Sequence, residues 1–317
     1  MDNLASPSYP LDIDYTAVND FTPNHGDWTS AGPVQNVIRS GNTFTLELAE
    51  GRRILLSFLS ATSFRLRFNP DPAAVYGPQG SPAVVKTDLG PVSLIVLENS
   101  QLRLIVDTGS MRLQIDRQPY RLRVFRGSQL IAADTPSYNL VYIPGHFVIA
   151  NFRQRPETAL YFGLGEKAGA QLNKSLFTLT QFNFDNYMYG VGGTVPSGPG
   201  PLNPSEPLYV SIPFLVEVNP NPNKEFAGAP YAYGLFLDNT SQSYFNLGSN
   251  DYSNMDGKIY YGALFGELDT YFLLGDHAQD VLAQYTTLTG RSPMPPRYAL
   301  GFHQGAYGYY DHDRLQA

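Results

Sequence analysis

Cysteine is absent from the 317 residues, and charged side chains make up only 15% of them. Without cysteine the chain has no disulfide, no thiolate metal site and no cysteine nucleophile. The formal net charge is −7, and lysine and arginine form no cluster along the sequence. Because nucleic-acid phosphates are bound by such clusters, a nucleic-acid partner is not expected.

Long apolar runs are also missing. No stretch of about 18 apolar residues occurs, which is the length that a membrane-spanning helix needs. The N-terminal segment contains no basic stretch followed by an apolar run, and so it does not read as a signal peptide. We expect a soluble protein without a membrane partner, cytoplasmic in location, or secreted if a leader has been removed.

Aromatic residues, glycine and proline are abundant instead: 22 Tyr, 19 Phe, 29 Gly and 25 Pro. This composition is typical of many short strands joined by tight turns, and it disfavours a helical bundle. The length leaves room for one large or two medium domains.

Apolar and polar residues alternate from Asn42 onward, after an irregular lead-in that we assign to residues 1–40. Such alternation predicts antiparallel strands with one face toward water, and Arg65 and Arg67 are expected on a wet face. The spacing of strands and turns predicts an antiparallel β-sandwich over residues 41–275. The predicted strands are 44–48, 54–58, 64–68, 92–97, 102–107, 111–116, 120–125, 231–238, 243–246, 259–263 and 268–274.

Residues 276–297 are predicted to form a helix followed by a proline linker. Asp276 is the expected N-cap, and Gly290 is expected to end the helix. Four apolar side chains are expected to share one face of it: Val281, Leu282, Tyr285 and Leu288. The linker contains Pro293, Pro295 and Pro296 and marks a domain boundary.

The segment Tyr298–Gly305 is apolar and has no polar face. A strand of this kind is buried on both sides and belongs to a parallel sheet or a barrel. We therefore predict that residues 298–317 begin a second domain and that the chain is the front part of a longer protein.

A long loop is predicted over residues 180–216, because five glycines and five prolines lie between Gly190 and Pro207. It opens on Phe184-Asp185-Asn186-Tyr187, an acid among aromatic rings. Aromatic faces and a carboxylate that accepts hydroxyl hydrogen bonds suit a sugar ring. The alternative is a covered Ω-loop whose aromatic side chains only pack.

Several motifs occur in an order that resembles a known family. They are Gly163–Glu166, Asn183–Asp185, Pro207–Phe214, Tyr233–Asp238, Gly266–Phe272 and Val281–Tyr310, and the most specific piece is Gln284–Gln304. Together they are similar to the N-terminal part of glycoside hydrolase family 31. The resemblance implies a mutarotase-like N-terminal β-sandwich, whose loop 180–213 is directed toward the (β/α)8 barrel (TIM barrel) that follows.

This resemblance implies a retaining enzyme that acts on α-linked glucosides or glucans without a cofactor, as an α-glucosidase or α-glucosyltransferase. An α-1,4-glucan lyase of the same family is the alternative, and Asn183–Asn186, Leu202–Pro204, Asp238–Asn246 and Gly301–Gly305 look closer to that branch. A free-standing carbohydrate-binding module is a third interpretation. The apolar segment at 298–305 argues against it.

The resemblance also implies substrate-binding residues. Asp185 holds the position at which the family's loop contacts the sugar where the bond is cut, and Asn186 and Tyr189 lie beside it. Asp185 could instead cap the following turn. His303 and Gln304 fall near the C-terminal end of the predicted barrel strand, where barrel enzymes place their active sites, although His303 could instead be a core histidine.

No catalytic residue is assigned in this chain. A retaining glycosidase needs two carboxylates about 5 to 5.5 Å apart, and the family's nucleophile sits in a Trp-x-Asp-Met type of motif. The single tryptophan, Trp28, is followed by Thr29 and Ser30. Glu166 and Asp238 are therefore predicted to bond to turns and backbone amides, and the chain alone is predicted to be inactive. No pair of histidines has metal-ligand spacing.

Overall fold

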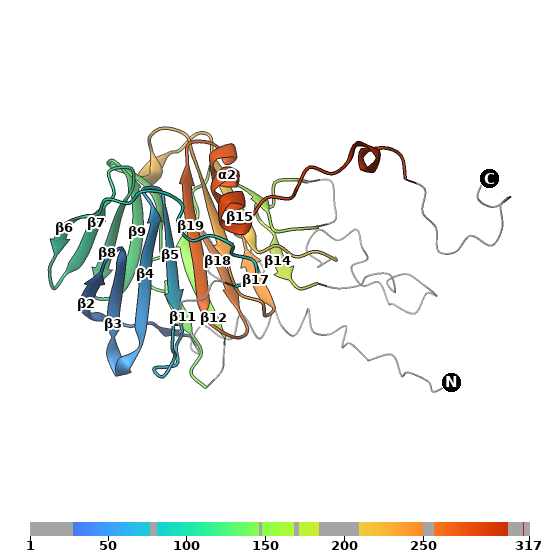
Figure 1. Ribbon diagram of the computed structural model, residues 1–317. Helices are drawn as coiled ribbons and strands as arrows, with labels where there is room; N and C mark the ends of the chain where they lie inside the picture. Colours follow the sequence, from blue (N-terminus) through green and yellow to red (C-terminus); the bar gives the residue numbers. More distant parts are fainter. Residues whose placement is uncertain are drawn as a thin grey trace, which may run out of the picture.

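The computed structural model describes residues 28–76, 81–145, 148–167, 171–183, 209–249, 257–303 and 313. Within them the chain forms three antiparallel sheets, one short α-helix and three short 3-10 helices (Figure 1). The predicted antiparallel β-sandwich is confirmed, and each of the predicted strands overlaps an observed one. No helix among the described residues is long and apolar enough to cross a membrane.

The largest sheet has eight strands, and it carries most of the elements discussed below. In spatial order these are β13 (Leu160–Gly163), β15 (Phe214–Asn219), β16 (Tyr231–Leu237), β19 (Leu268–Gly275), β5 (Ser63–Phe68), β4 (Arg53–Ser60), β3 (Thr43–Leu48) and β2 (Val34–Ser40). Strand β19 therefore joins the N-terminal strands to the later ones.

The two smaller sheets complete the sandwich. The six-stranded sheet contains β1 (Thr29–Ser30), β11 (Leu140–Tyr142), β12 (Ile149–Gln154), β18 (Lys258–Ala263), β17 (Ser243–Asn246) and β14 (Thr178–Gln181). The five-stranded sheet contains β10 (Gln129–Ala133), β9 (Tyr120–Arg126), β8 (Arg112–Arg117), β7 (Arg103–Asp107) and β6 (Ile95–Asn99). The 3-10 helices are η1 (Ala49–Gly51), η3 (Lys224–Phe226) and η4 (Arg297–Leu300).

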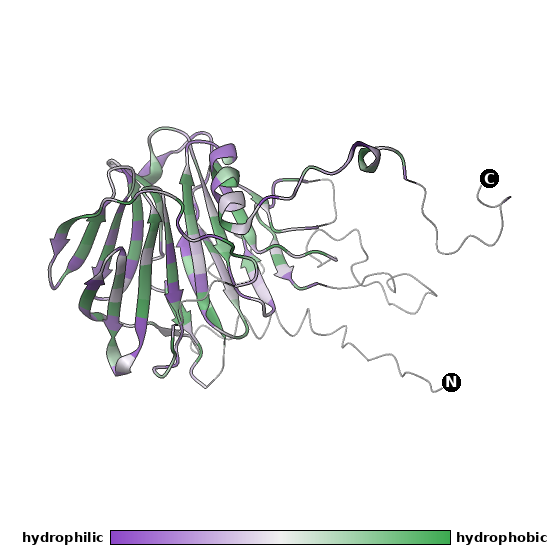
Figure 2. Ribbon diagram, viewed as in Figure 1, coloured by the Kyte–Doolittle hydropathy of each residue, from purple (hydrophilic) through white to green (hydrophobic). Residues whose placement is uncertain are grey.

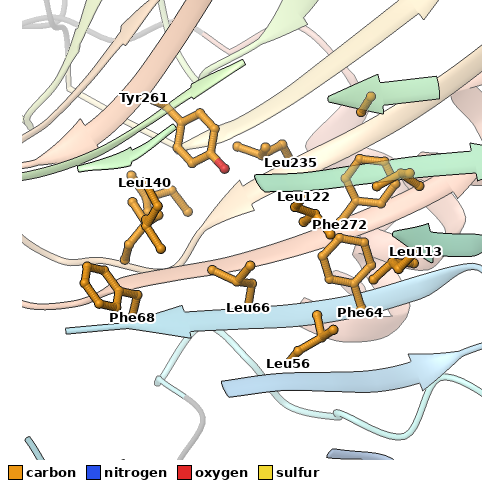
Figure 3. Packing of buried hydrophobic residues seen from close by; sticks show 14 of the residues in the cluster. Leu56, Phe64, Leu66, Phe68, Leu113, Leu122, Leu140, Leu235, Tyr261 and Phe272 are labelled. Carbon is orange, nitrogen blue, oxygen red and sulfur yellow. The ribbon is translucent and has the colours of Figure 1, made fainter. Parts of the chain in front are cut away.

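A single apolar core lies between the sheets, because alternate residues along each strand point to one face. Figure 2 shows the resulting green and purple alternation along the strands. Figure 3 shows core side chains from all three sheets, among them Leu66, Leu113 and Tyr261. Phe64 and Phe272 stack with ring centroids 5.0 Å apart, and Phe272 stacks in turn on Tyr233 at 4.8 Å. The core thus ties β5, β19 and β16 together.

Two strands lie within residues 1–40, and the prediction of an irregular lead-in is therefore wrong for residues 29–30 and 34–40. β2 pairs with β3 at the edge of the eight-stranded sheet. Most of its side chains are exposed on both faces, so no apolar alternation marks it in the sequence.

Arg65 does not lie on a wet face as predicted. The residue is only 8% exposed, and its Nε donates to the Asp269 carboxylate at 2.7 Å. The guanidinium also lies over the Tyr271 ring, 5.0 Å from the centroid. A second apolar cluster, formed with the α-helix α2 (Ala278–Thr289), covers this outer face of the sheet.

The predicted helix is confirmed as α2, and it ends at Gly290. Its N-cap is His277 rather than Asp276, because the Asp280 carboxylate accepts from the backbone N–H of both residues, at 2.9 and 3.1 Å. Leu282 does not share the buried face, being 47% exposed. Val281, Tyr285 and Leu288 follow the spacing of four and three residues that lines one side of a helix.

The predicted barrel strand Tyr298–Gly305 is not formed among the residues that the structure describes. Arg297–Leu300 form η4, and Phe302 is 90% exposed. Figure 1 shows this segment leading away from the sandwich. Since a strand is completed by hydrogen bonds to a neighbouring strand, an unpaired apolar segment does not form one. Residues 304 and 305 lie outside the described part.

The Arg65–Asp269 pair generates a stability prediction. Asp269→Asn keeps the shape but leaves a buried guanidinium without its anion, and we expect the free energy of unfolding to fall by about 3 kcal/mol. Urea denaturation followed by tryptophan or far-ultraviolet signals measures this loss. The matched control is Glu98→Gln, which removes the exposed pair with Arg103 and should leave the unfolding midpoint unchanged. Equal midpoints for the two variants would contradict the prediction.

Candidate functional site

The two stems of the long loop are fixed to the rim of the sandwich. The loop's middle, residues 184–208, lies outside the described residues, and so do the predicted site residues Asp185, Asn186 and Tyr189. In the stems, Ser211 Oγ accepts from the backbone N–H of Phe182 at 2.9 Å. Asn183 Oδ1 accepts from the backbone N–H of Ser211 at 2.7 Å. The stems are thus bonded to each other where they leave the sheets.

The Gly163–Glu166 turn holds the second stem from the other side. Leu164 N–H donates to the Phe214 carbonyl at 3.0 Å, and Glu166 N–H donates to the Val210 carbonyl at 2.7 Å. Both glycines have positive φ, 97° and 77°. A Cβ on Gly163 would collide with the Phe214 carbonyl oxygen, and one on Gly165 would lie 2.5 Å from that of Val210. The motif therefore needs glycine because two backbones approach closely, and the Glu166 residue itself is exposed.

A hollow of about 700 Å³ opens beside these stems. Its walls come from the ends of β14 and β16, the start of β17, the second stem and α2. Aromatic rings of Phe182, Phe236 and Tyr285 form part of the wall. Tyr285 is held in place because its ring stacks on Phe214, with centroids 3.8 Å apart.

Three polar side chains in this hollow lack a hydrogen-bond partner among the described residues. Gln181 and Ser243 are register partners on β14 and β17, only 3% and 1% exposed, and both amide atoms of Gln181 and the Ser243 hydroxyl are unpaired. Asp238 Oδ2 is buried and unpaired as well, whereas we had predicted that this carboxylate bonds to turns and backbone amides. Buried polar groups are nearly always paired in folded proteins, so three of them in one hollow indicate a binding surface.

The sequence-predicted residues and this hollow do not coincide. His303 lies exposed just after η4, on the segment that leads away from the sandwich in Figure 1, and Gln304 is outside the described residues. Gln181 and Ser243 were missed. The signal that could have found them is their alternation with Leu179 and Phe245, which places polar residues on the core-facing side of two strands. Among the described residues no cluster of acidic and histidine side chains could hold a metal ion.

A second group of polar residues lies fully inside the sandwich, and its members are paired with one another. Glu217 on β15 accepts from Tyr233 OH at 2.6 Å and from Tyr231 OH at 3.2 Å. Burial raises the pKa of Glu217 to about 7, although the tyrosine hydrogen bonds lower it. Asn219 and Thr158 extend the network. Because Glu217 is completely buried, this cluster supports the fold and is not a substrate site.

This raised pKa predicts a pH dependence of stability. The folded protein holds the Glu217 proton up to pH 7 or so, whereas the unfolded chain releases it near pH 4.5. Folding therefore loses stability as the pH rises through this window. Glu217→Gln cannot titrate, and its thermal midpoint should rise relative to the wild type by several degrees between about pH 5 and 8.

Scanning calorimetry across that range measures the difference. Glu225→Gln, at an exposed position, is the matched control and should follow the wild-type curve. Parallel curves for wild type and Glu217→Gln would mean that Glu217 is not the titrating group.

Comparisons with known proteins agree with this architecture. Residues 53–246 match the family model described as the glycosyl hydrolase 31 N-terminal galactose mutarotase-like domain. Alpha-glucosidase 2 of Bacillus thermoamyloliquefaciens is 32% identical over 198 residues, which are 62% of this chain and 21% of that protein. An alpha-glucosidase of Saccharolobus solfataricus is 29% identical over 153 residues, 48% of this chain and 18% of that one. The chain thus spans about a fifth of these relatives' length.

Two solved structures show the same fold. The GH31 dextranase of Flavobacterium johnsoniae, complexed with glucose, superposes with a TM-score of 0.70 and 26% identity, covering 86% of this chain and 30% of that one. The α-1,4-glucan lyase of Gracilariopsis lemaneiformis also gives a TM-score of 0.70, with 23% identity, and covers 87% and 32%.

Proposed function

The chain belongs to glycoside hydrolase family 31, whose N-terminal mutarotase-like domain it matches, and we propose that it is the N-terminal part of a retaining enzyme acting on α-linked glucosides. The observation that carries this proposal is the match of residues 53–246 to that domain, together with the 32% identity to an α-glucosidase. The activity is hydrolysis or glucosyl transfer. In both chemistries the glucosyl unit is first transferred to a carboxylate with inversion to the β configuration, and attack by water or a second sugar then restores the α configuration.

In this enzyme the chain's task is to present the loop. The bonds between the stems, and those from the Gly163–Glu166 turn, fix where residues 184–208 leave the sandwich. We place Asp185 at the sugar's hydroxyl groups, with Asn186 and Tyr189 beside it. A carboxylate that accepts two hydroxyl hydrogen bonds orients the sugar strongly.

The rim of the sandwich that carries the loop is proposed to face the catalytic barrel of the same enzyme, which supplies both catalytic carboxylates. The exposed apolar side chains of Tyr298, Leu300 and Phe302 support this assignment, since such side chains are normally covered. His303 follows them directly and is proposed, with Gln304, to lie at the substrate end of the first barrel strand.

A lyase of the same family is the second candidate, and the motifs at Asn183–Asn186 and Asp238–Asn246 favour it. Its intermediate is resolved by elimination, so maltose gives one anhydrofructose and one glucose, the leaving group, whereas hydrolysis gives two glucose molecules. Product analysis after digestion of maltose by the complete enzyme distinguishes the two. A free-standing carbohydrate-binding module would instead bind glucans without turnover in any context.

We predict that the 317-residue chain releases neither glucose nor anhydrofructose from maltose or starch, because the catalytic carboxylates are proposed to lie outside it. The measurement is product formation by purified, homogeneous chain, with the complete enzyme as the positive control. Turnover by the chain at a constant specific activity through successive purification steps would refute this.

Asp185 is tested in the complete enzyme. Asp185→Asn keeps the shape and removes a charge-assisted hydrogen bond worth about 1.5–3 kcal/mol, so kcat/KM should fall about ten- to a hundredfold. The thermal midpoint should hardly change. If Asp185 only caps a turn, kcat/KM stays intact and the midpoint drops slightly, since asparagine caps nearly as well. Asp88→Asn, in an exposed loop, is the control and should alter neither quantity.

A further inference from the structure

The hollow beside the loop stems contains polar groups that the fold leaves unused. Gln181 and Ser243 face each other across β14 and β17, on the side of the sheet that faces the core through Leu179 and Phe245. They lie where that core reaches the rim, and both are at least nine-tenths buried. Since neither has a partner among the described residues, both point to an occupant that supplies one.

The chemical groups that line the hollow indicate which class of ligand it would bind. None of the lining residues that the structure describes is Lys, Arg or His, and Asp238 contributes a carboxylate, so an anionic ligand is disfavoured. One carboxylate among these described residues is too few for a metal ion, which takes several charged oxygen ligands. The unpaired groups comprise an amide that donates and accepts, a hydroxyl that does either, and an acceptor-only carboxylate. A neutral ligand with many hydroxyl groups satisfies all three, because each hydroxyl both donates and accepts.

The apolar part of the wall fits the same class of ligand. Phe182 and Tyr285 are half-buried aromatic residues of the wall, against which the carbon face of a pyranose can pack. The volume, about 700 Å³, lies within the usual range for small-molecule sites and exceeds the need of one hexose unit. A short oligosaccharide therefore fits better than a monosaccharide.

We propose that this hollow is a binding site for α-linked gluco-oligosaccharides on the sandwich itself, with Gln181, Ser243 and Asp238 as its hydrogen-bonding residues. The α-glucan identity rests on the proposed function. The site's place beside the stems means that a glucan held there lies next to the loop that we propose to contact substrate. A segment of the enzyme's own barrel is the competing occupant. A sugar is favoured because vicinal hydroxyls offer adjacent donors and acceptors on one edge, as the neighbouring Gln181 and Ser243 require.

Calorimetric titration of the 317-residue chain with maltotriose tests the proposal. We expect one site with a millimolar dissociation constant and no heat of binding with myo-inositol at the same concentration. Asp238→Asn should weaken binding about tenfold or more, through loss of a charge-assisted bond. The matched control Gln101→Leu, at an exposed position, should bind as the wild type does.

The variant Gln181→Leu separates a binding role from a structural one. Without sugar its thermal midpoint should equal or exceed that of the wild type, because an unpaired buried amide is replaced by an apolar group of similar size. Its maltotriose affinity should fall at least tenfold. A markedly lower midpoint, undiminished affinity, or no binding of maltotriose to the wild type each overturns the proposal. So does a crystal structure of the complete enzyme in which barrel residues fill the hollow.

Activity measurements on the complete enzyme distinguish a failure of the proposed function from a failure of this inference. If the site operates, Gln181→Leu keeps kcat on a short aryl α-glucoside but raises KM for a long glucan. Binding by the chain without any α-glucoside turnover by the complete enzyme would refute the proposed function alone. Turnover without binding would refute this inference alone.

Discussion

The pairing of β19 with β5 is the constraint on which the remaining structure depends. Arg65 and Asp269 bond across it although they are 204 residues apart in the sequence. On the inner face, Phe64 and Phe272 stack in the core. On the outer face, the cluster around α2 covers the sheet. Exclusion of water there strengthens the attraction between the two charges but also costs their desolvation. Tyr285 of this helix lines the hollow at the rim.

Much of the fold was predictable, since strands that bury one face carry their signal in the sequence. β3, β4 and β8 alternate apolar and polar residues, and they were predicted almost to the residue. β2 was missed because an exposed edge strand has no apolar face to display. β12 was missed because it buries two polar residues, Asn151 and Arg153, which are of types usually found at the surface. They are buried because both contact the Asp134 carboxylate. The pattern of residues along one strand does not show which distant residues will pair with its polar side chains.

The candidate site was predictable only in part. The Gly163–Glu166 motif could be seen in the sequence, but its purpose could not, because the backbone that approaches Gly165 lies more than 40 residues further along the chain at Val210. Likewise, Gln181 and Ser243 become neighbours only when β14 pairs with β17. The residues implied by family resemblance, Asp185 above all, stay predictions because they lie outside the described part. Sequence motifs therefore located the loop, while the structure was needed to find the polar groups at its base.

The interior of this sandwich uses buried polar groups in two ways, and the contrast bears on function. Glu217 is completely enclosed, yet Tyr231 and Tyr233 donate to it, so the fold itself satisfies the acid. At the rim, Gln181, Ser243 and the Oδ2 atom of Asp238 are buried and unpaired among the described residues. A protein under selection for stability alone would replace the rim groups with apolar residues, since an unpaired buried group costs about 1–3 kcal/mol. Other buried groups of the sandwich, such as the Tyr271 hydroxyl, are also unpaired among the described residues. Gln181, Ser243 and Asp238 differ from them because they lie together beside one hollow, and this is why we assign them to a ligand.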